Sequence, residues 1–292
     1  MTAPAALPYL DRAEIDRRLG PAGAFAALEA ALLAGLDPES DPPRGVLEVE
    51  GGQLLVMPSA AGGHPVVKLV TVGGNPRVQG ICVVFDGATL APAALVDGIA
   101  LTNLRTAAVS AVAVDRLAVP DARRLLVFGR GPQGEAHVEA IRRIRPIAEV
   151  DVVGRDRDRA DADVDGLVAS ADVICCCTTA RQPLFDGRLV ADHATVVAIG
   201  SHEREVRETD DALAARSTVV VESRASALRE AGDVVLAVAA GALDPSAIVS
   251  LADVVRGGAE LDQRRPRLFK STGMSWEDAV VAAALIESPP EP

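Results

Sequence analysis

The spacing of apolar residues changes along the chain and divides it into two parts. Residues 13–36 carry apolar residues at helical spacing, interrupted at Gly20-Pro21, and predict two short helices. From about 44 to 102, short apolar runs alternate with turn signals such as Gly51-Gly52, which predict β-hairpins. A helix is expected from Arg105, in the segment RTAAVSAVAVDRLA. The first part is therefore predicted to be α+β with an antiparallel sheet.

After Pro120 the pattern becomes one of short, wholly apolar runs separated by polar or helix-like segments. These runs end near residues 128, 153, 177, 199 and 221. A spacing of about 22–25 residues is typical of βαβ units, so a doubly wound parallel sheet of the Rossmann type is expected over 121–265. The last segment, SWEDAVVAAALIES, predicts a helix with a serine cap ahead of Glu277 that packs back on the first part. The predicted domains are residues 1–118 with 268–292, and residues 119–267.

Composition and charge exclude several classes of function. The chain has 292 residues and is 49% hydrophobic, which is enough for two domains. A formal net charge of -12 and only seven aromatic residues argue against nucleic acid and anionic membranes as partners. There is no apolar run of about 18 residues and no basic segment followed by an apolar one at the N-terminus, so we expect a soluble, cytoplasmic protein.

Cysteines and histidines do not suggest a metal site. Three of the four cysteines are adjacent, Cys175, Cys176 and Cys177, in the run DVICCCTT. Neighbours on a strand point to opposite faces, so they suit neither a disulfide nor a CxxC metal site. We expect them to be small apolar residues of a buried strand in a reduced protein, and we expect no metal.

The strongest local motif is LLVFGRGPQG, a G-x-G-x-x-G pattern at Gly129, Gly131 and Gly134. Alone the pattern is common, but here it follows an apolar strand and opens a helix through Pro132 and Gln133. Glycines at these positions let the backbone approach a pyrophosphate held at the helix N-terminus. The motif therefore predicts dinucleotide binding.

The choice of cofactor is indicated at the end of the second strand of this domain. An acid about 20 residues after the last glycine would bind a ribose 2′-hydroxyl. That position is Gly154, and Arg155 follows it. The missing acid, together with the guanidinium of the next residue, favours a 2′-phosphate, and hence NADP(H) over NAD(H). The alternative is that Arg155 pairs with an aspartate of the following RDRDRADAD stretch.

Four further side chains are candidates for the reaction. Lys68 is one of only two lysines, against 27 arginines, and lies in the apolar run PVVKLVTV. A buried ammonium is costly, so it indicates function, unless the lysine reaches solvent from a strand edge. With Arg44 and Arg105 it would clamp a carboxylate, although Arg105 would also serve as a helix cap or surface pair. His202 follows the strand TVVAIG, where ligands bind, but a structural role is the alternative.

Eight segments in order resemble the ornithine cyclodeaminase/mu-crystallin family, and the resemblance runs from Arg44 almost to the C-terminus. They are Met57-Pro58, VVKLVT, RTAAVSA, FGRGPQG, ADVICCCTT with Pro183, VVAIGSHEREVRETDD, ESRASALREAGDV and LFKSTGMSWEDAVVAA.

The resemblance implies a homodimer in which the discontinuous first domain forms the dimer interface and the substrate pocket. It makes Arg44, Lys68 and Arg105 substrate-binding residues, with Leu55 and Met57 beside them. It implies that the Rossmann domain binds NAD(H) or NADP(H). It places Thr178 and Gly200 near the cofactor, and Ser271, Thr272 and Gly273 where cofactor and substrate meet.

Two departures from the family pattern shape the expected function. Cyclodeaminases of the family carry acids at the positions of Leu55 and His202, and both acids are missing here. We therefore expect a reductase of a carboxylate-bearing imine, such as Δ1-pyrroline-2-carboxylate or Δ1-piperideine-2-carboxylate, with Lys68 or His202 supplying the proton. The alternatives are an ornithine cyclodeaminase, an alanine or opine-type dehydrogenase, and an NADPH-regulated protein that binds a small ligand.

Overall fold

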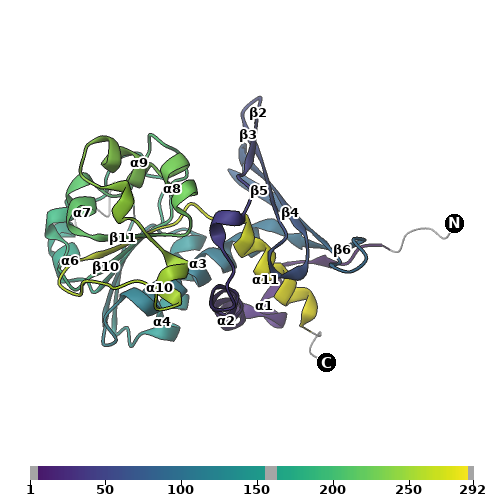
Figure 1. Ribbon diagram of the computed structural model, residues 1–292, viewed down its shortest axis with the longest axis horizontal. Coiled ribbons are helices and arrows are strands. Elements are labelled where there is room, and N and C mark those ends of the chain that lie inside the picture. Colours follow the sequence, from purple (N-terminus) through teal and green to yellow (C-terminus); the bar gives the residue numbers. More distant parts are fainter. Residues whose placement is uncertain (1–5, 155–162, 289–292) are drawn as a thin grey trace. The chain divides into compact units, whose positions relative to one another are not determined.

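The computed structural model describes residues 6–154 and 163–288 of the chain. It divides into two compact units, residues 1–105 with 274–292, and residues 106–273. The sequence placed the two junctions at 118/119 and 267/268. Each unit is built on one sheet (Figure 1), so the predicted combination of a Rossmann sheet with an α+β part is confirmed.

The first unit contains a six-stranded sheet of order β1-β6-β5-β4-β3-β2. All neighbours are antiparallel except β1 and β6, which are parallel, so the sheet is mixed where the sequence predicted an antiparallel one. One face is buried, and α11 packs against β3, β4 and β5. The elements are β1 (Tyr9–Leu10), α1 (Arg12–Arg18), α2 (Gly20–Leu33), β2 (Gly45–Val49), β3 (Gly52–Ser59), β4 (Val66–Gly73), β5 (Val78–Phe85), β6 (Pro92–Asp97) and α11 (Ser275–Glu287), with α3 (Gly98–Leu117) crossing the junction between the units.

The helix that carries Arg105 begins earlier than the sequence predicted. The Asp97 carboxylate accepts hydrogen bonds from the N–H groups of Ile99, at 2.9 Å, and Ala100, at 3.0 Å. Asp97 therefore caps α3, and the helix starts directly where β6 ends. Arg105 lies about two turns inside the helix, so it is not the cap that the sequence left open.

The start of α11 also differs from the prediction. Ser275 is the first residue of the helix, and Met274 takes the cap position. Glu277 Oε1 accepts the N–H of Met274 at 3.2 Å, which satisfies one backbone donor at the helix start. The expected serine cap is therefore wrong by one residue, although the glutamate does bond back to the cap.

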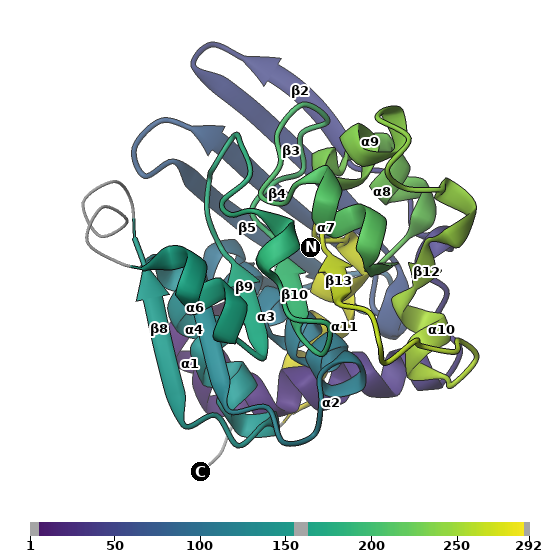
Figure 2. The ribbon, with the colours of Figure 1, turned by 90° about the vertical axis from the view of Figure 1, so that its left-hand side faces the viewer.

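The second unit contains a seven-stranded parallel sheet of order β12-β11-β13-β10-β9-β7-β8, with β8 and β12 at opposite edges (Figure 2). Five strands match the predicted apolar runs. The sequence missed β12 and the central β13, because β12 has two residues and β13 is RLFK, which carries a charge at each end. The elements are β7 (Arg124–Phe128), α4 (Pro132–Ile144), β8 (Glu149–Val153), α6 (Val164–Ser170), β9 (Val173–Cys176), β10 (Thr195–Ala198), α7 (Asp211–Arg216), β11 (Thr218–Val221), α8 (Arg224–Glu230), α9 (Gly232–Ala239), β12 (Val249–Ser250), α10 (Leu251–Val255) and β13 (Arg267–Lys270).

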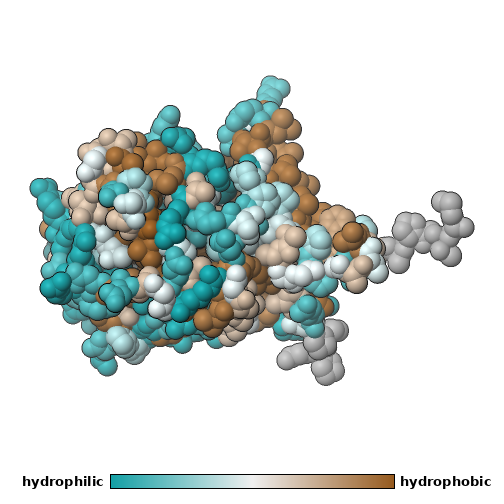
Figure 3. Space-filling view, in the orientation of Figure 1, coloured by the Kyte–Doolittle hydropathy of each residue, from teal (hydrophilic) through white to brown (hydrophobic). Residues whose placement is uncertain are grey.

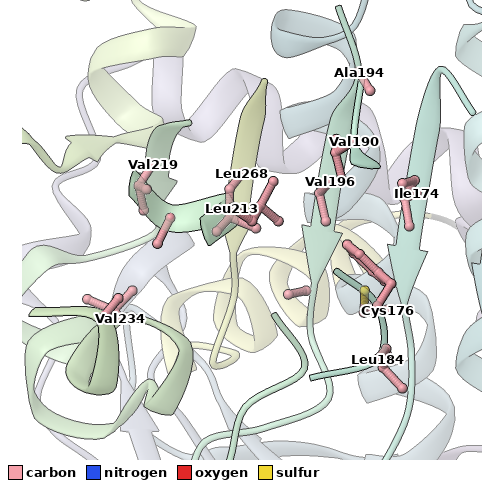
Figure 4. Close-up of a cluster of buried hydrophobic side chains, with 14 of the residues drawn as sticks. Ile174, Cys176, Leu184, Val190, Ala194, Val196, Leu213, Val219, Val234 and Leu268 are labelled. Atoms are coloured by element: carbon pink, nitrogen blue, oxygen red, sulfur yellow. The ribbon is translucent and has the colours of Figure 1, made fainter. Parts of the chain in front are cut away.

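The core on one side of this sheet is built from its short apolar strands. Figure 4 shows Ile174 and Cys176 of β9, Val196 of β10 and Leu268 of β13 among the side chains of this cluster. Cys175 and Cys176 are fully buried and free, as the sequence predicted for small apolar residues of a strand.

Candidate functional site

The glycine motif forms a tight turn between β7 and α4 that leaves the helix start open. Gly129 has φ +114°, and a Cβ there would lie 2.4 Å from the carbonyl oxygen of Cys177. A Cβ on Gly134 would lie 2.2 Å from the oxygen of Gly129, so this glycine lets the helix approach the strand. Gly131 is the N-cap of α4, where no side chain caps the helix and a Cβ would meet nothing within 4 Å. These features fit a dinucleotide pyrophosphate at the start of α4.

The turn lies where the strand order of the parallel sheet reverses. From β7 the chain passes to β8 on one side and then crosses to β9 on the other. The Gly129 N–H bonds to the oxygen of Val153 at the end of β8 (2.9 Å), and the Cys177 N–H bonds to the oxygen of Phe128 (2.8 Å). Ligands of doubly wound folds bind at this kind of switch point.

The two residues predicted to distinguish NADP(H) from NAD(H) follow β8. Gly154 comes directly after the strand, and Arg155 lies outside the described residues. Arg130, inside the glycine motif, donates from Nη2 to the oxygen of Val152 at 3.2 Å. This exposed arginine was not among the predicted site residues, although its position within G-R-G-P-Q-G points to it.

Two predicted cofactor-binding residues lie two positions after the ends of neighbouring strands. Thr178 follows β9 and Gly200 follows β10, and both are bonded to the carboxylate of Glu208. His202 lies two residues beyond Gly200 and is partly exposed. The structure thus places all three at the carboxyl edge of the parallel sheet.

The segment Ser271–Gly273 after β13 is held in place by Glu222, which was not among the predicted site residues. Ser271 Oγ donates to Glu222 Oε1 at 2.6 Å, and the Thr272 N–H donates to Glu222 Oε2 at 3.0 Å. The Gly273 N–H in turn donates to Ser271 Oγ at 3.2 Å. Glu222 follows β11, so it joins two neighbouring strand ends.

In the first unit, Lys68 and Arg105 are buried and share one aspartate. Lys68 is 1% exposed on β4, between β3 and β5, so the alternative of a lysine reaching solvent from a strand edge is excluded. Its Nζ lies 2.6 Å from Asp278 Oδ2. Arg105 donates from Nε to Asp278 Oδ1 (3.2 Å) and from Nη1 to Glu277 Oε2 (2.5 Å). We call Lys68, Arg105, Glu277 and Asp278 the charge quartet.

The electrostatics of the charge quartet suit a proton donor. Burial lowers the pKa of Lys68 to about 8, Asp278 opposes this shift, and Arg105 adds to it. Two formal positive and two formal negative charges balance. Lys68 and Arg105 are therefore not the bare cations that the clamp hypothesis assumed, because two acids of α11 compensate them.

The predicted apolar contacts of the substrate lie on the same sheet face as Lys68. Met57 is the direct cross-strand neighbour of Lys68, and Leu55 that of Val70. Leu55, Met57 and Val70 form one buried cluster. Arg44 directly precedes β2, whose first residue, Gly45, pairs with Val56 next to Met57. Arg44 is partly buried.

Residues 6–154 and 163–288 hold no group of three or more His, Cys, Asp or Glu residues that could bind a metal ion. They also hold no helix that is long and apolar enough to cross a membrane.

Comparisons with known proteins show the family of this chain and several similar enzymes. The model of the ornithine cyclodeaminase/mu-crystallin family matches residues 22–290. The chain is 34% identical over 224 residues to a Δ1-pyrroline-2-carboxylate reductase of Colwellia psychrerythraea, covering 70% of this chain and 71% of the relative. It is 32% identical to a Δ1-pyrroline-2-carboxylate/Δ1-piperideine-2-carboxylate reductase of Azospirillum brasilense, with 97% of both chains covered.

A solved structure agrees with this result. The fold matches that of a Δ1-pyrroline-2-carboxylate reductase of Thermococcus litoralis in complex with NADH and L-proline. The TM-score is 0.89, the identity is 26%, and 97% of each chain is covered.

Proposed function

Because this chain belongs to the ornithine cyclodeaminase/mu-crystallin family, we propose that it is an NAD(P)H-dependent reductase of a small cyclic ketimine carboxylate. The substrate class is that of Δ1-pyrroline-2-carboxylate and Δ1-piperideine-2-carboxylate, which the names of its relatives carry. The observation that carries the proposal is the charge quartet, since it combines donors for a carboxylate with a proton donor in a desolvated place.

The balanced charge of the quartet suits a zwitterion. Arg105 and Lys68 donate to the substrate carboxylate, and Arg44 is the third cation of this group. The imine nitrogen takes up its proton inside the site, from Lys68 Nζ, and the positive charge that it then carries balances the charge of the substrate carboxylate. Leu55 and Met57 supply an apolar surface for the ring methylenes.

The reaction requires a hydride and a proton at neighbouring atoms. A bound nicotinamide supplies the hydride to the imine carbon next to the carboxylate. Lys68 holds the proton at Nζ and delivers it to the imine nitrogen, while Asp278 keeps the ammonium charged. Arg105 orients the carboxylate, and its two acidic partners fix the guanidinium. His202 is the second candidate for relaying the proton.

The same residues disfavour ornithine as a substrate. Its side-chain ammonium would meet Leu55, where cyclodeaminases of the family have an acid. Glu277 and Asp278 are bonded to Arg105 and Lys68 and would have to leave them to pair with it. An unpaired buried charge costs several kcal/mol.

The test is a panel of substrates with purified protein. NADPH or NADH oxidation is expected with both cyclic ketimines, and Arg105→Ala should reduce kcat/KM strongly while Arg12→Ala, at an exposed ion pair, leaves it unchanged. Oxidation only with pyruvate and ammonia would indicate an amino-acid dehydrogenase, and ammonia release from ornithine a cyclodeaminase. Binding without any turnover would indicate a storage protein.

The cofactor is proposed to be NADP(H) in preference to NAD(H). Gly154 in place of an acid, with Arg155 next to it and Arg130 bonded to the end of β8, supports a 2′-phosphate site. Dissociation constants of the two reduced cofactors test this directly. A lower value for NADH would reverse the assignment.

The assembly is proposed to be a homodimer formed through the outer face of the six-stranded sheet. The outer face is the side opposite Lys68, and its apolar residues include Leu47, Val49, Leu54, Val56, Val67, Leu69, Ile81, Val83 and Leu95. All of them are partly or fully exposed in the single chain. Figure 3 shows apolar surface along the β2–β3 hairpin. An apolar face of this extent is typical of an interaction surface.

The location is proposed to be the cytoplasm. All four cysteines are free, and the described structure buries Cys82, Cys175 and Cys176, which fits a reducing compartment.

A further inference from the structure

Both lysines of this chain are fully buried, and each faces an aspartate. Lys68 belongs to the charge quartet, whereas Lys270 lies in the second unit and has no role in the reaction described above. Lys270 ends β13 in the middle of the parallel sheet, opposite Ala198 of β10 and Val221 of β11. Its Nζ lies 3.1 Å from Asp233 Oδ2, and neither side chain is exposed. Removing an ion pair from water costs free energy, so the groups that this pair keeps in place indicate its role.

Asp233 connects this lysine to the chain segment before α7. Its Oδ1 accepts three hydrogen bonds, from the N–H of Glu208 (2.9 Å), the N–H of Thr209 (2.8 Å) and the hydroxyl of Thr209 (2.8 Å). The backbone at Glu208 is therefore fixed from the buried side.

The Glu208 carboxylate reaches from there to two strand ends. Oε1 accepts the N–H of Thr178 at 2.9 Å and its hydroxyl at 2.7 Å, and Oε2 accepts the N–H of Gly200 at 2.7 Å. A Cβ on Gly200 would lie 2.0 Å from the oxygen of Thr178, so the two segments are in close contact. Thr178 follows Cys177, whose oxygen borders Gly129 of the dinucleotide turn.

The pKa of Glu208 lies close to neutral pH because burial and the neighbouring charges shift it. Burial raises the pKa of Glu208 to about 7, Lys270 opposes this, and Asp233 adds to it. Burial also acts to raise the pKa of Asp233, but Lys270 and the Thr209 bonds outweigh it, so this pKa lies below its usual value. The neighbouring thiols Cys175, Cys176 and Cys177 stay neutral, because burial raises their pKa values.

We propose that Glu208, supported by Asp233 and Lys270, is a positioning residue that sets Thr178 and Gly200 for the dinucleotide before it binds. The inference rests on the dinucleotide site of the proposed function and deepens it. A carboxylate suits this task because it accepts at both oxygens, and two backbone N–H groups from different strands need acceptors here. Segments fixed in advance lose little conformational freedom on binding.

The test compares Glu208→Gln with Asp172→Asn. The amide of glutamine presents an NH2 group to one of the two backbone N–H groups, which then loses its acceptor. Asp172 is a matched control, since it accepts from the N–H groups of Arg123 (2.7 Å) and Arg124 (2.9 Å) at the other end of the sheet. We expect Glu208→Gln to speed amide exchange at Thr178 and Gly200 in the free protein. We also expect it to raise the dissociation constant for NADPH by about tenfold, with kcat at saturating cofactor changed by less than about twofold.

The outcomes separate this inference from the function on which it rests. If the wild-type protein bound neither NADPH nor NADH, the dinucleotide site itself would be wrong. If the wild-type protein bound the cofactor and Glu208→Gln bound it equally well, the positioning role would be overturned. Equal weakening by Asp172→Asn would also overturn it, because the effect would then be one of general stability.

A second variant serves if Glu208→Gln does not fold. Lys270→Met combined with Asp233→Val removes both charges together and leaves the N–H groups of Glu208 and Thr209 without their acceptor, so the support of Glu208 is lost. A raised dissociation constant supports the proposal, and an unchanged one contradicts it.

Discussion

At the scale of single residues, the charge quartet shows what a sequence reveals about a buried site. Lys68 and Arg105 were recognisable because cations in apolar segments need a reason to be there. Their partners were not, because Asp278 lies 173 positions from Arg105 along the chain. Glu277 and Asp278 resemble the acids that commonly stabilise a helix start, and only the packing of α11 against β4 reveals that they pair with buried cations.

The pH dependence of reduction follows from Lys68. Its proton is needed for the reaction, so activity should be present at lower pH and fall as the pH rises through about 8, the pKa of Lys68. Asp278 raises that pKa, so Asp278→Asn should move the fall to a lower pH. The measurement is kcat/KM against pH for both proteins.

The control for this profile is Asp16→Asn, at an exposed ion pair of α1. It should leave the profile unchanged. A wild-type profile that stays flat to pH 10, or a fall that Asp278→Asn does not move, would remove Lys68 from the proton transfer.

At the scale of elements, the dinucleotide turn could be predicted from neighbouring residues, whereas the place of β13 and the start of α3 could not. The turn between β7 and α4 follows from three glycines and the strand before them, all within one short segment. β13 could not be predicted from RLFK, since its place between β10 and β11 and the burial of Lys270 depend on residues far along the chain. The early start of α3 depends on a single cap, Asp97.

Two alanine substitutions separate the roles of the glycines in this turn. Gly131→Ala meets open space, so its melting temperature should stay near that of the wild type, while its dissociation constant for NADPH rises about tenfold through contact with the pyrophosphate. Gly134→Ala meets the Gly129 oxygen and should lower the melting temperature. Thermal unfolding and cofactor titration measure both. Normal cofactor affinity in Gly131→Ala would place the pyrophosphate elsewhere.

At the scale of the whole molecule, the two candidate sites lie in different units. The dinucleotide turn lies in one and the charge quartet in the other. The sequence predicted such a division from the change in apolar spacing near Pro120. It predicted the strands of the first sheet as well, except β1 at Tyr9–Leu10. The exposed outer face follows only from the register, which shows which side α11 leaves uncovered.

The proposed dimer is tested with two leucines of similar exposure. Leu47 on the outer face is 57% exposed and Leu33 on α2 is 53% exposed. Leu47→Glu should shift the mass in solution from twice 30.1 kDa towards 30.1 kDa, because a charge at a buried interface is costly, whereas Leu33→Glu should not. Sedimentation velocity reports both masses. A dimer that persists in Leu47→Glu, or a monomeric wild type, would contradict this interface.

The central claim is that hydride passes to the imine carbon beside the carboxylate. Its most direct test is reduction of Δ1-pyrroline-2-carboxylate with NADPH deuterated at C4 of the nicotinamide on the transferring face. We predict one proline per NADPH oxidised, with deuterium at the α carbon and none elsewhere. Proline without deuterium at that carbon, or NADPH oxidation without proline, would contradict the account.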